Sequence, residues 1–165
     1  MLAAEDVEAL RLGGRRIVRA LREAGELAVD EINAAGGVNG KKIQLIIRDD
    51  NANPGDAVRA AEELVSREGV EVLSGAFLSH IGLALTDFSK QKKFFFLAGE
   101  PLTDKIVWQN GHKYTFRLRA STYMQAAMLV PEAAKLKKKR WAVVYPNYEY
   151  GQSAVATFKQ LLKAA

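Results

Sequence analysis

A serine and a histidine stand together where a short apolar run gives way to a helical pattern. Ser79 and His80 are neighbours in sequence, so their side chains do not point at each other, and no nucleophile elbow surrounds the serine. A hydroxyl beside the free N–H groups of a helix start is instead suited to an anion such as a carboxylate. The alternative is that Ser79 only caps the helix. His80 is expected to orient or pack the site.

The acidic residues at the ends of two expected strands are the other candidates for chemistry. Asp49 and Asp50 suggest magnesium or phosphoacceptor chemistry, but a receiver-like domain also needs a second strand-end aspartate and a strand-end lysine, which are not evident. A loop role beside Asn51 is therefore expected for this pair. Glu100 ends a later strand, where it can pair with an ammonium or another cation, or stay a solvated loop charge.

Several chemistries are excluded by residue types and spacing. The chain has no cysteine, which rules out disulfides, a thiolate metal site and a cysteine nucleophile. Its glycine-rich stretches fit neither a dinucleotide fingerprint nor a P-loop. No catalytic residue, metal or cofactor is therefore expected.

Hydrophobic periodicity places these residues on alternating helices and strands. Helices are expected at residues 15–35, 54–67, 79–91, 121–136 and 151–165, with a helical turn at 103–107. Strands are expected at residues 42–48, 70–74, 93–98, 114–118 and 141–145. This alternation indicates an α/β fold with a doubly wound, mostly parallel sheet. The first strand is apolar on both faces, which is typical of a sheet covered on both sides.

The composition sets outer limits on the protein class. The chain has 165 residues, 48% hydrophobic and 26% charged, which is the balance of a globular protein. The formal charge of +5 comes from basic clusters without interleaved aromatics, so solvated faces are favoured over nucleic-acid binding. No apolar run approaches the roughly 20 residues of a membrane span. The acidic first residues show no signal peptide, so the chain as written is expected in the cytoplasm as expressed.

Seven stretches together resemble one family. They are ELAVDEINAAGGVNG (26–40), RDD (48–50), AVRAAEELVSREGV (57–70), GAFLSH (75–80), AGEPLT (98–103), YTFR (114–117) and VYPNYEYG (144–151). Over residues 25–165 the sequence resembles the type I periplasmic binding proteins, in the leucine/isoleucine/valine-binding branch that serves ABC transporters. The resemblance implies two flavodoxin-like lobes that close on a ligand. It further implies a non-enzymatic protein that delivers an amino acid or similar small carboxylate to an ABC permease.

The resemblance also assigns roles to residues. It implies that Ser79 holds the α-carboxylate of the ligand, with His80 beside it. It implies that Ala98, Gly99 and Glu100 line the cleft, with Glu100 in place of a usual threonine. Tyr150 is implied to face the cleft from the second lobe, with Tyr145 and Tyr148 as alternatives and simple packing as the other interpretation.

The chain departs from the family at its beginning and in its length. Residues 1–24 form an atypical helical segment where members have a strand and a Ser/Gly-rich loop; residues 25–120 correspond to the first lobe, and 121–165 to an incomplete second lobe. A truncated form with weak or no binding is therefore expected. The alternatives are a flavodoxin-like or receiver-like domain with an enzymatic or phosphoacceptor role, and a non-binding scaffold.

The first strand is central in a flavodoxin-like sheet, and a helix in its place has a consequence for assembly. The strand at 42–48 then exposes an apolar edge, and the strand at 141–145 has no sheet of its own. We expect either one rearranged sheet that includes residues 141–145 or a homodimer through these edges, the dimer being favoured.

Overall fold

The structure is a computed structural model that describes residues 4–165, with side chains from residue 19 onward. Internal contacts divide the chain into two units, Met1–Ile47 and Arg48–Ala165, which are described separately. The three-part division expected from the sequence, with boundaries at 24/25 and 120/121, stays a prediction.

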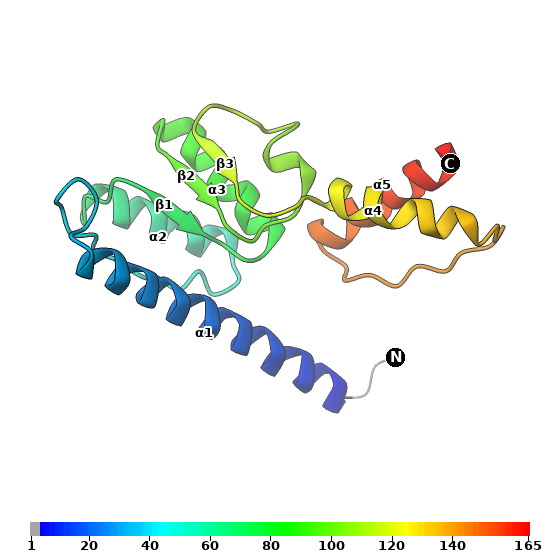
Figure 1. Ribbon diagram of the computed structural model, residues 1–165, viewed down its shortest axis with the longest axis horizontal. Helices are drawn as coiled ribbons and strands as arrows, with labels where there is room; N and C mark the ends of the chain where they lie inside the picture. Colours follow the sequence, from blue (N-terminus) through cyan, green and yellow to red (C-terminus); the bar gives the residue numbers. More distant parts are fainter. Residues whose placement is uncertain (1–3) are drawn as a thin grey trace. The chain divides into compact units, whose positions relative to one another are not determined.

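The first unit is built on one long helix, α1 (Ala4–Ala34), shown in blue in Figure 1. The expected helix at 15–35 is confirmed, as is the helical character of residues 4–14; the part of that expectation that falls on residues 1–3 lies outside the described residues. Gly36 and Gly37 follow the helix with φ angles of 104° and 76°, values that glycine adopts without strain. A side chain at Gly37 would also collide with the backbone carbonyl of Lys41. This glycine pair therefore ends the helix.

The strand expected at 42–48 is wrong, because these residues belong to no strand of the structure. A strand exists through ladder hydrogen bonds to a neighbour, and the sheet leaves this segment out. Asn33 of α1 holds its beginning instead. The Asn33 amide donates to the carbonyl of Ile43 over 2.8 Å, and its Oδ1 accepts from the Ile43 N–H over 2.7 Å.

The second unit contains a three-stranded parallel sheet in the order β1-β2-β3. The strands are β1 (Leu73–Gly75), β2 (Phe96–Ala98) and β3 (Thr115–Arg117). Helix α3 (Ser79–Lys92) connects β1 to β2, and the short 3₁₀ helix η1 (Asp104–Ile106) lies between β2 and β3. The parallel α/β fold predicted from the alternating pattern is confirmed.

Helices α2 (Pro54–Ser66) and α3 pack together and share a core with the sheet. The buried core residues come from both helices, from β1, β2 and η1: Ala61, Leu73, Phe88, Phe96, Ala98 and Ile106. Side chains alternate along a strand, so the second face of the sheet carries Ser74 and Phe116, both exposed. Within this unit, the expected helical cover on both faces is found on one face only.

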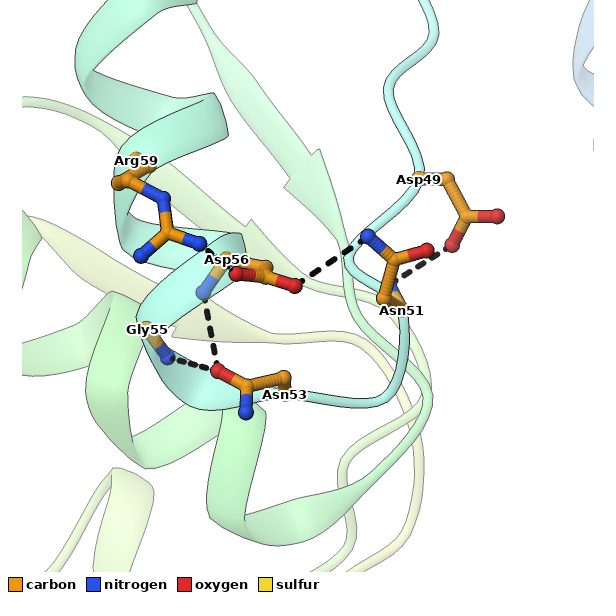
Figure 2. Close-up of polar contacts among 6 residues, drawn as sticks. All are labelled: Asp49, Asn51, Asn53, Gly55, Asp56 and Arg59. Carbon is orange, nitrogen blue, oxygen red and sulfur yellow. Dashed lines mark hydrogen bonds and ion pairs between the residues drawn. The ribbon is translucent and has the colours of Figure 1, made fainter.

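The loop before α2 accounts for the paired aspartates. Asp49 Oδ1 accepts the Asn51 N–H over 2.8 Å (Figure 2). Asp50 Oδ1 accepts the Ala52 N–H over 2.8 Å. Asn53 then caps α2 by accepting the N–H groups of Gly55 and Asp56. Both aspartate carboxylates thus stabilise turns, and the predicted loop role is confirmed.

Helices α4 (Thr122–Lys135) and α5 (Glu149–Ala164) lie side by side at the C-terminal end of the unit (Figure 1). Ser121 caps α4 by accepting the Met124 N–H over 3.2 Å. The strand expected at 141–145 is wrong: the segment is in no strand, and Val144 is fully exposed. The rearranged single sheet expected from the sequence is therefore wrong as well, because no strand of the described chain pairs with these residues. The dimer stays a prediction.

Candidate ligand-binding site

The carboxyl ends of β1 and β2 lie side by side and define one edge of the sheet. Gly75 and Ala98 are register partners, and the Gly99 N–H donates to the Gly75 carbonyl over 3.3 Å. Ser79 opens the helix that follows β1. Ser79 and Gly99 therefore occupy the same edge, which is where parallel α/β sheets bind ligands.

Ser79 is buried, at 1% exposure, and its hydroxyl is partly engaged. Its Oγ accepts the backbone N–H groups of Leu102 and Thr103, each over 3.3 Å. A hydroxyl accepts with two lone pairs and donates one proton, so this arrangement leaves the O–H for a further acceptor. The helix cap is Leu78, without a side-chain bond, so the predicted cap role of Ser79 is wrong.

The backbone of the first turn of α3 adds to this donor. The first N–H with a helical partner is that of Gly82, which donates to the Leu78 carbonyl over 3.0 Å. The N–H groups of residues 79–81 precede it at the positive end of the helix dipole. Together with the Ser79 O–H they form a site suited to a carboxylate.

A pocket of about 190 Å³ opens at this point. Its lining comes from the strand-end loops and from the beginning of α5: Phe77, Ser79, Glu100, Leu102, Arg119, Tyr148 and Tyr150. Ser79, Glu100 and Tyr150 of the predicted set are thus brought together, and so is the alternative Tyr148. Its volume is below the roughly 300–1,000 Å³ of pockets for drug-sized ligands, which indicates a small solute.

The remaining predicted residues, His80, Ala98 and Gly99, are not among the residues that line the pocket. Ala98 is fully buried in β2, and Gly99 is not among the lining residues. The His80 ring packs edge-on against Tyr148, with ring centroids 5.6 Å apart, and its Nδ1 is buried without a partner among the described residues. His80 thus supports a tyrosine of the pocket wall.

Sequence reasoning missed three lining residues: Phe77, Leu102 and Arg119. Arg119 had a usable signal, because it follows the end of β3 and strand ends form the crevice. It forms an ion pair with Glu100, whose side chain is 20% exposed. Glu100 therefore already has a cation from its own chain, and is more than a solvated loop charge.

The two pocket tyrosines flank a residue that fixes their position. Glu149, in the first turn of α5, accepts from the Thr103 hydroxyl over 2.8 Å and pairs with Lys105 Nζ at 3.0 Å. The rings of Tyr148 and Tyr150 are 6.1 Å apart. Burial raises the pKa of Tyr148, and the nearby Tyr150 raises it further.

A second contact fastens the same loop to α4. The buried carboxylate of Asp104 accepts from the Thr122 hydroxyl over 2.6 Å and from the Tyr123 N–H over 3.0 Å. Arg117 donates to the Thr103 carbonyl over 3.1 Å. Burial lowers the pKa of Arg117, and the charge of Asp104 opposes that shift. The loop after β2 thus positions the starts of both helices.

The described part of the chain contains no cluster of three histidine, aspartate or glutamate side chains able to hold a metal ion. None of its helices is long and apolar enough to cross a membrane.

Curated relatives align with most of this chain. The chain is 29% identical over 149 residues to the leucine-, isoleucine-, valine-, threonine- and alanine-binding protein of Pseudomonas aeruginosa, covering 88% of this chain and 39% of that protein. It is 32% identical to Leu/Ile/Val-binding protein homolog 7 of Brucella abortus, covering 85% of this chain and 37% of that one. The chain thus spans about two-fifths of the length of these relatives.

Solved structures give the same match. An ABC transporter substrate-binding protein from Desulfitobacterium hafniense in complex with Leu aligns with a TM-score of 0.74 and 26% identity, over 84% of this chain and 41% of that one. A solute-binding protein from Rhodopseudomonas palustris BisB5 in complex with 3,4-dihydroxy benzoic acid aligns with a TM-score of 0.72 and 28% identity, over 81% and 36% of the two chains.

A sequence profile described as periplasmic binding protein matches residues 14–165, almost the whole chain. This match confirms the resemblance found in the seven sequence stretches, and the named relatives confirm its branch. The chain belongs to the periplasmic binding protein family, in the branch of the leucine/isoleucine/valine-binding proteins.

Proposed function

We propose that this chain is the solute-binding component of an ABC transporter and captures a small carboxylate at the pocket beside Ser79. The observation that carries the proposal is the Ser79 hydroxyl, which keeps its proton available beside the first N–H groups of α3. A carboxylate accepts from such donors with both oxygens.

The relatives narrow the class of ligand. One structural relative is described in complex with Leu, and another with 3,4-dihydroxy benzoic acid. Both compounds join a carboxylate to a compact apolar body. The pocket offers anion donors on one side and the side chains of Phe77, Leu102 and Tyr148 around it, which supports a ligand of that kind.

The mechanism is capture and release without chemistry, so we expect no catalytic activity. The family is periplasmic, and we propose that the ligand passes to an ABC permease there. Affinity depends on how completely walls surround the ligand. Because this pocket is open and small, we expect millimolar binding by the 165-residue chain, equivalent to about 4 kcal/mol.

Thermal-shift measurements test the proposal with leucine, isoleucine and 4-hydroxybenzoate as probes. A ligand that binds the native state raises its melting temperature. We expect a rise at millimolar probe, lost in Ser79→Ala and in Tyr150→Ala but kept in the control Ser66→Ala, a serine exposed on α2. No rise with any carboxylate would contradict the proposal. A rise with magnesium and a phosphodonor alone would favour the receiver-like alternative.

We also propose that a second copy of the chain pairs with residues 141–145. The segment is apolar and outside the sheet, with Val144 fully exposed, and an unpaired segment of this composition can pair with a strand of another chain. Antiparallel pairing centred on Val143 places Trp141 opposite Tyr145, a favourable aromatic pair. Light scattering should show a dimer that Val144→Lys weakens and the control Val38→Lys, another exposed valine, does not. A monomer at all concentrations would contradict this proposal.

A further inference from the structure

We propose that the pocket of this chain selects carboxylates that have an apolar or aromatic body and no ammonium group. The inference rests on the proposed function, and it identifies which carboxylates the same site prefers. It follows from the charges around the pocket, since each carboxylate next to it is already paired within the chain.

One end of the pocket offers hydrogen-bond donors to an anion. Ser79 retains a free O–H, because its lone pairs accept from Leu102 and Thr103. The N–H groups at the start of α3 lie beside it. These groups donate hydrogen bonds to a ligand carboxylate, but they cannot accept a hydrogen bond from a ligand cation.

A ligand ammonium group would need an unpaired acidic side chain at the pocket. Glu100 is the carboxylate of the pocket lining, and Arg119 of the same lining forms an ion pair with it. Glu149 lies between the two pocket tyrosines, but it is held by Thr103 and Lys105 and has a side-chain exposure of only 13%. Both acidic groups are thus matched by cations of the chain itself.

An amino acid would therefore add a positive charge, its ammonium group, for which the pocket has no unpaired acidic partner. Its ammonium would lose water without gaining an unpaired carboxylate, which costs free energy. Approaching Glu100, it would meet the guanidinium of Arg119, and like charges placed together disfavour a ligand. A carboxylate without an ammonium avoids both costs.

The apolar part of a ligand would contact aromatic and aliphatic side chains of the pocket. The lining offers the rings of Phe77, Tyr148 and Tyr150 and the side chain of Leu102. Aromatic rings pack favourably against one another in offset or edge-on arrangements. The His80 ring packs edge-on against Tyr148, which holds the tyrosine ring in place at the pocket. These walls fit an apolar body, and an aromatic one best.

Two matched pairs of compounds test the inference, since each pair differs only by the ammonium group. They are 3-phenylpropionate with L-phenylalanine, and 4-methylpentanoate with L-leucine. Each is titrated into the 165-residue chain carrying ¹³C-labelled tyrosine, and the tyrosine signals give dissociation constants in the millimolar range. We expect the member without the ammonium to bind about tenfold more tightly in both pairs.

Two variants separate the ammonium effect from general changes. Arg119→Gln leaves Glu100 unpaired, so we expect the difference within each pair to shrink or reverse. The control Arg140→Gln removes an exposed arginine outside the pocket lining and should leave the difference unchanged. 3-Phenylpropanol, which lacks the carboxylate, should not bind.

The outcomes distinguish this inference from the proposed function. If L-phenylalanine and L-leucine bind as well as or better than their partners, the selectivity is overturned while carboxylate capture stands. If none of the four compounds moves the tyrosine signals, carboxylate capture itself is overturned. A preference unaffected by Arg119→Gln would show that the Glu100–Arg119 pair is not its cause, and would overturn the proposed selectivity.

Discussion

Thr103 donates a hydrogen bond of 2.8 Å to Glu149, which joins the loop after β2 to the first turn of α5. Lys105 adds an ion pair to the same carboxylate at 3.0 Å. Because Tyr148 and Tyr150 flank Glu149 in sequence, this contact fixes where both tyrosines stand at the pocket. The positions of both tyrosines in the pocket wall thus depend on Glu149, which is not itself a lining residue.

Breaking this contact should loosen the start of α5. In Thr103→Val the Glu149 carboxylate loses a buried hydroxyl donor, and we expect a loss of about 1–3 kcal/mol in unfolding free energy. Hydrogen exchange in the first turn of α5 should rise, and the ¹³C signals of Tyr148 and Tyr150 should move. Thr103→Ser keeps the hydroxyl and is the matched control. Unchanged exchange in the valine variant would contradict the positioning role.

Asp104 should stabilise the start of α4 by an unfolding free energy similar to that expected for the Thr103–Glu149 contact. Asp104→Ala removes the acceptor of the Thr122 hydroxyl and of the Tyr123 N–H at the helix start, in a buried position. We expect a loss of about 1–3 kcal/mol, since buried donors are left without partners. The control Glu132→Ala breaks an exposed pair with Lys135 and should cost less than about 1 kcal/mol. Urea unfolding of both variants measures the difference, and equal losses would refute the argument.

Alanine should destabilise the fold at Gly82 and be tolerated at Gly99. A Cβ at Gly82 would lie 2.6 Å from side-chain atoms of Pro101 and 3.1 Å from Ile106 Cδ1, inside the packed contact between α3 and the loop after β2. Overpacking of this kind costs about 1–3 kcal/mol. At Gly99 nothing lies within 4 Å of the added carbon, so Gly99→Ala should be tolerated. Chemical denaturation measures the unfolding free energy of both variants. An unchanged value for Gly82→Ala would show that the loop after β2 moves to make room for the added carbon.

The sequence predicted the helices better than the strands, for a physical reason. The start of α2 and the end of α1 depend on local residues, the Asn53 cap and the Gly36–Gly37 pair, so they need no partner elsewhere in the chain. Strands depend on partners elsewhere in the chain. Residues 42–48 and 141–145 have the composition of strands, but neither segment belongs to a strand in the described part of the chain.

The site was predictable where it follows from topology. Parallel strands end at one edge, so Ser79 and Glu100 could be placed together from the alternating pattern alone. Arg119 was missed although the same rule applies after β3. The pairing of Glu100 with Arg119 and of Glu149 with Thr103 could not be predicted, because these contacts join residues 19 and 46 positions apart.

The last prediction concerns alkaline pH and Tyr148. Burial raises the pKa of this phenol, with a further rise from Tyr150. The folded state therefore holds the proton more tightly than the unfolded state, whose tyrosines titrate near pH 10. The stability contributed by neutral Tyr148 is fully present below about pH 10 and is lost as the pH rises through the folded pKa.

Tyr148→Phe should remove this dependence. The wild-type chain should lose unfolding free energy more steeply above about pH 10 than the variant, because phenylalanine has no proton to release. Tyr114→Phe is the control, since Tyr114 lies before β3, outside the pocket lining. ¹³C titration of the labelled tyrosines should show one signal with a raised pKa that disappears in Tyr148→Phe. If its titration lies at the ordinary value, α5 does not hold Tyr148 against the pocket, because an exposed phenol would not be shifted by burial.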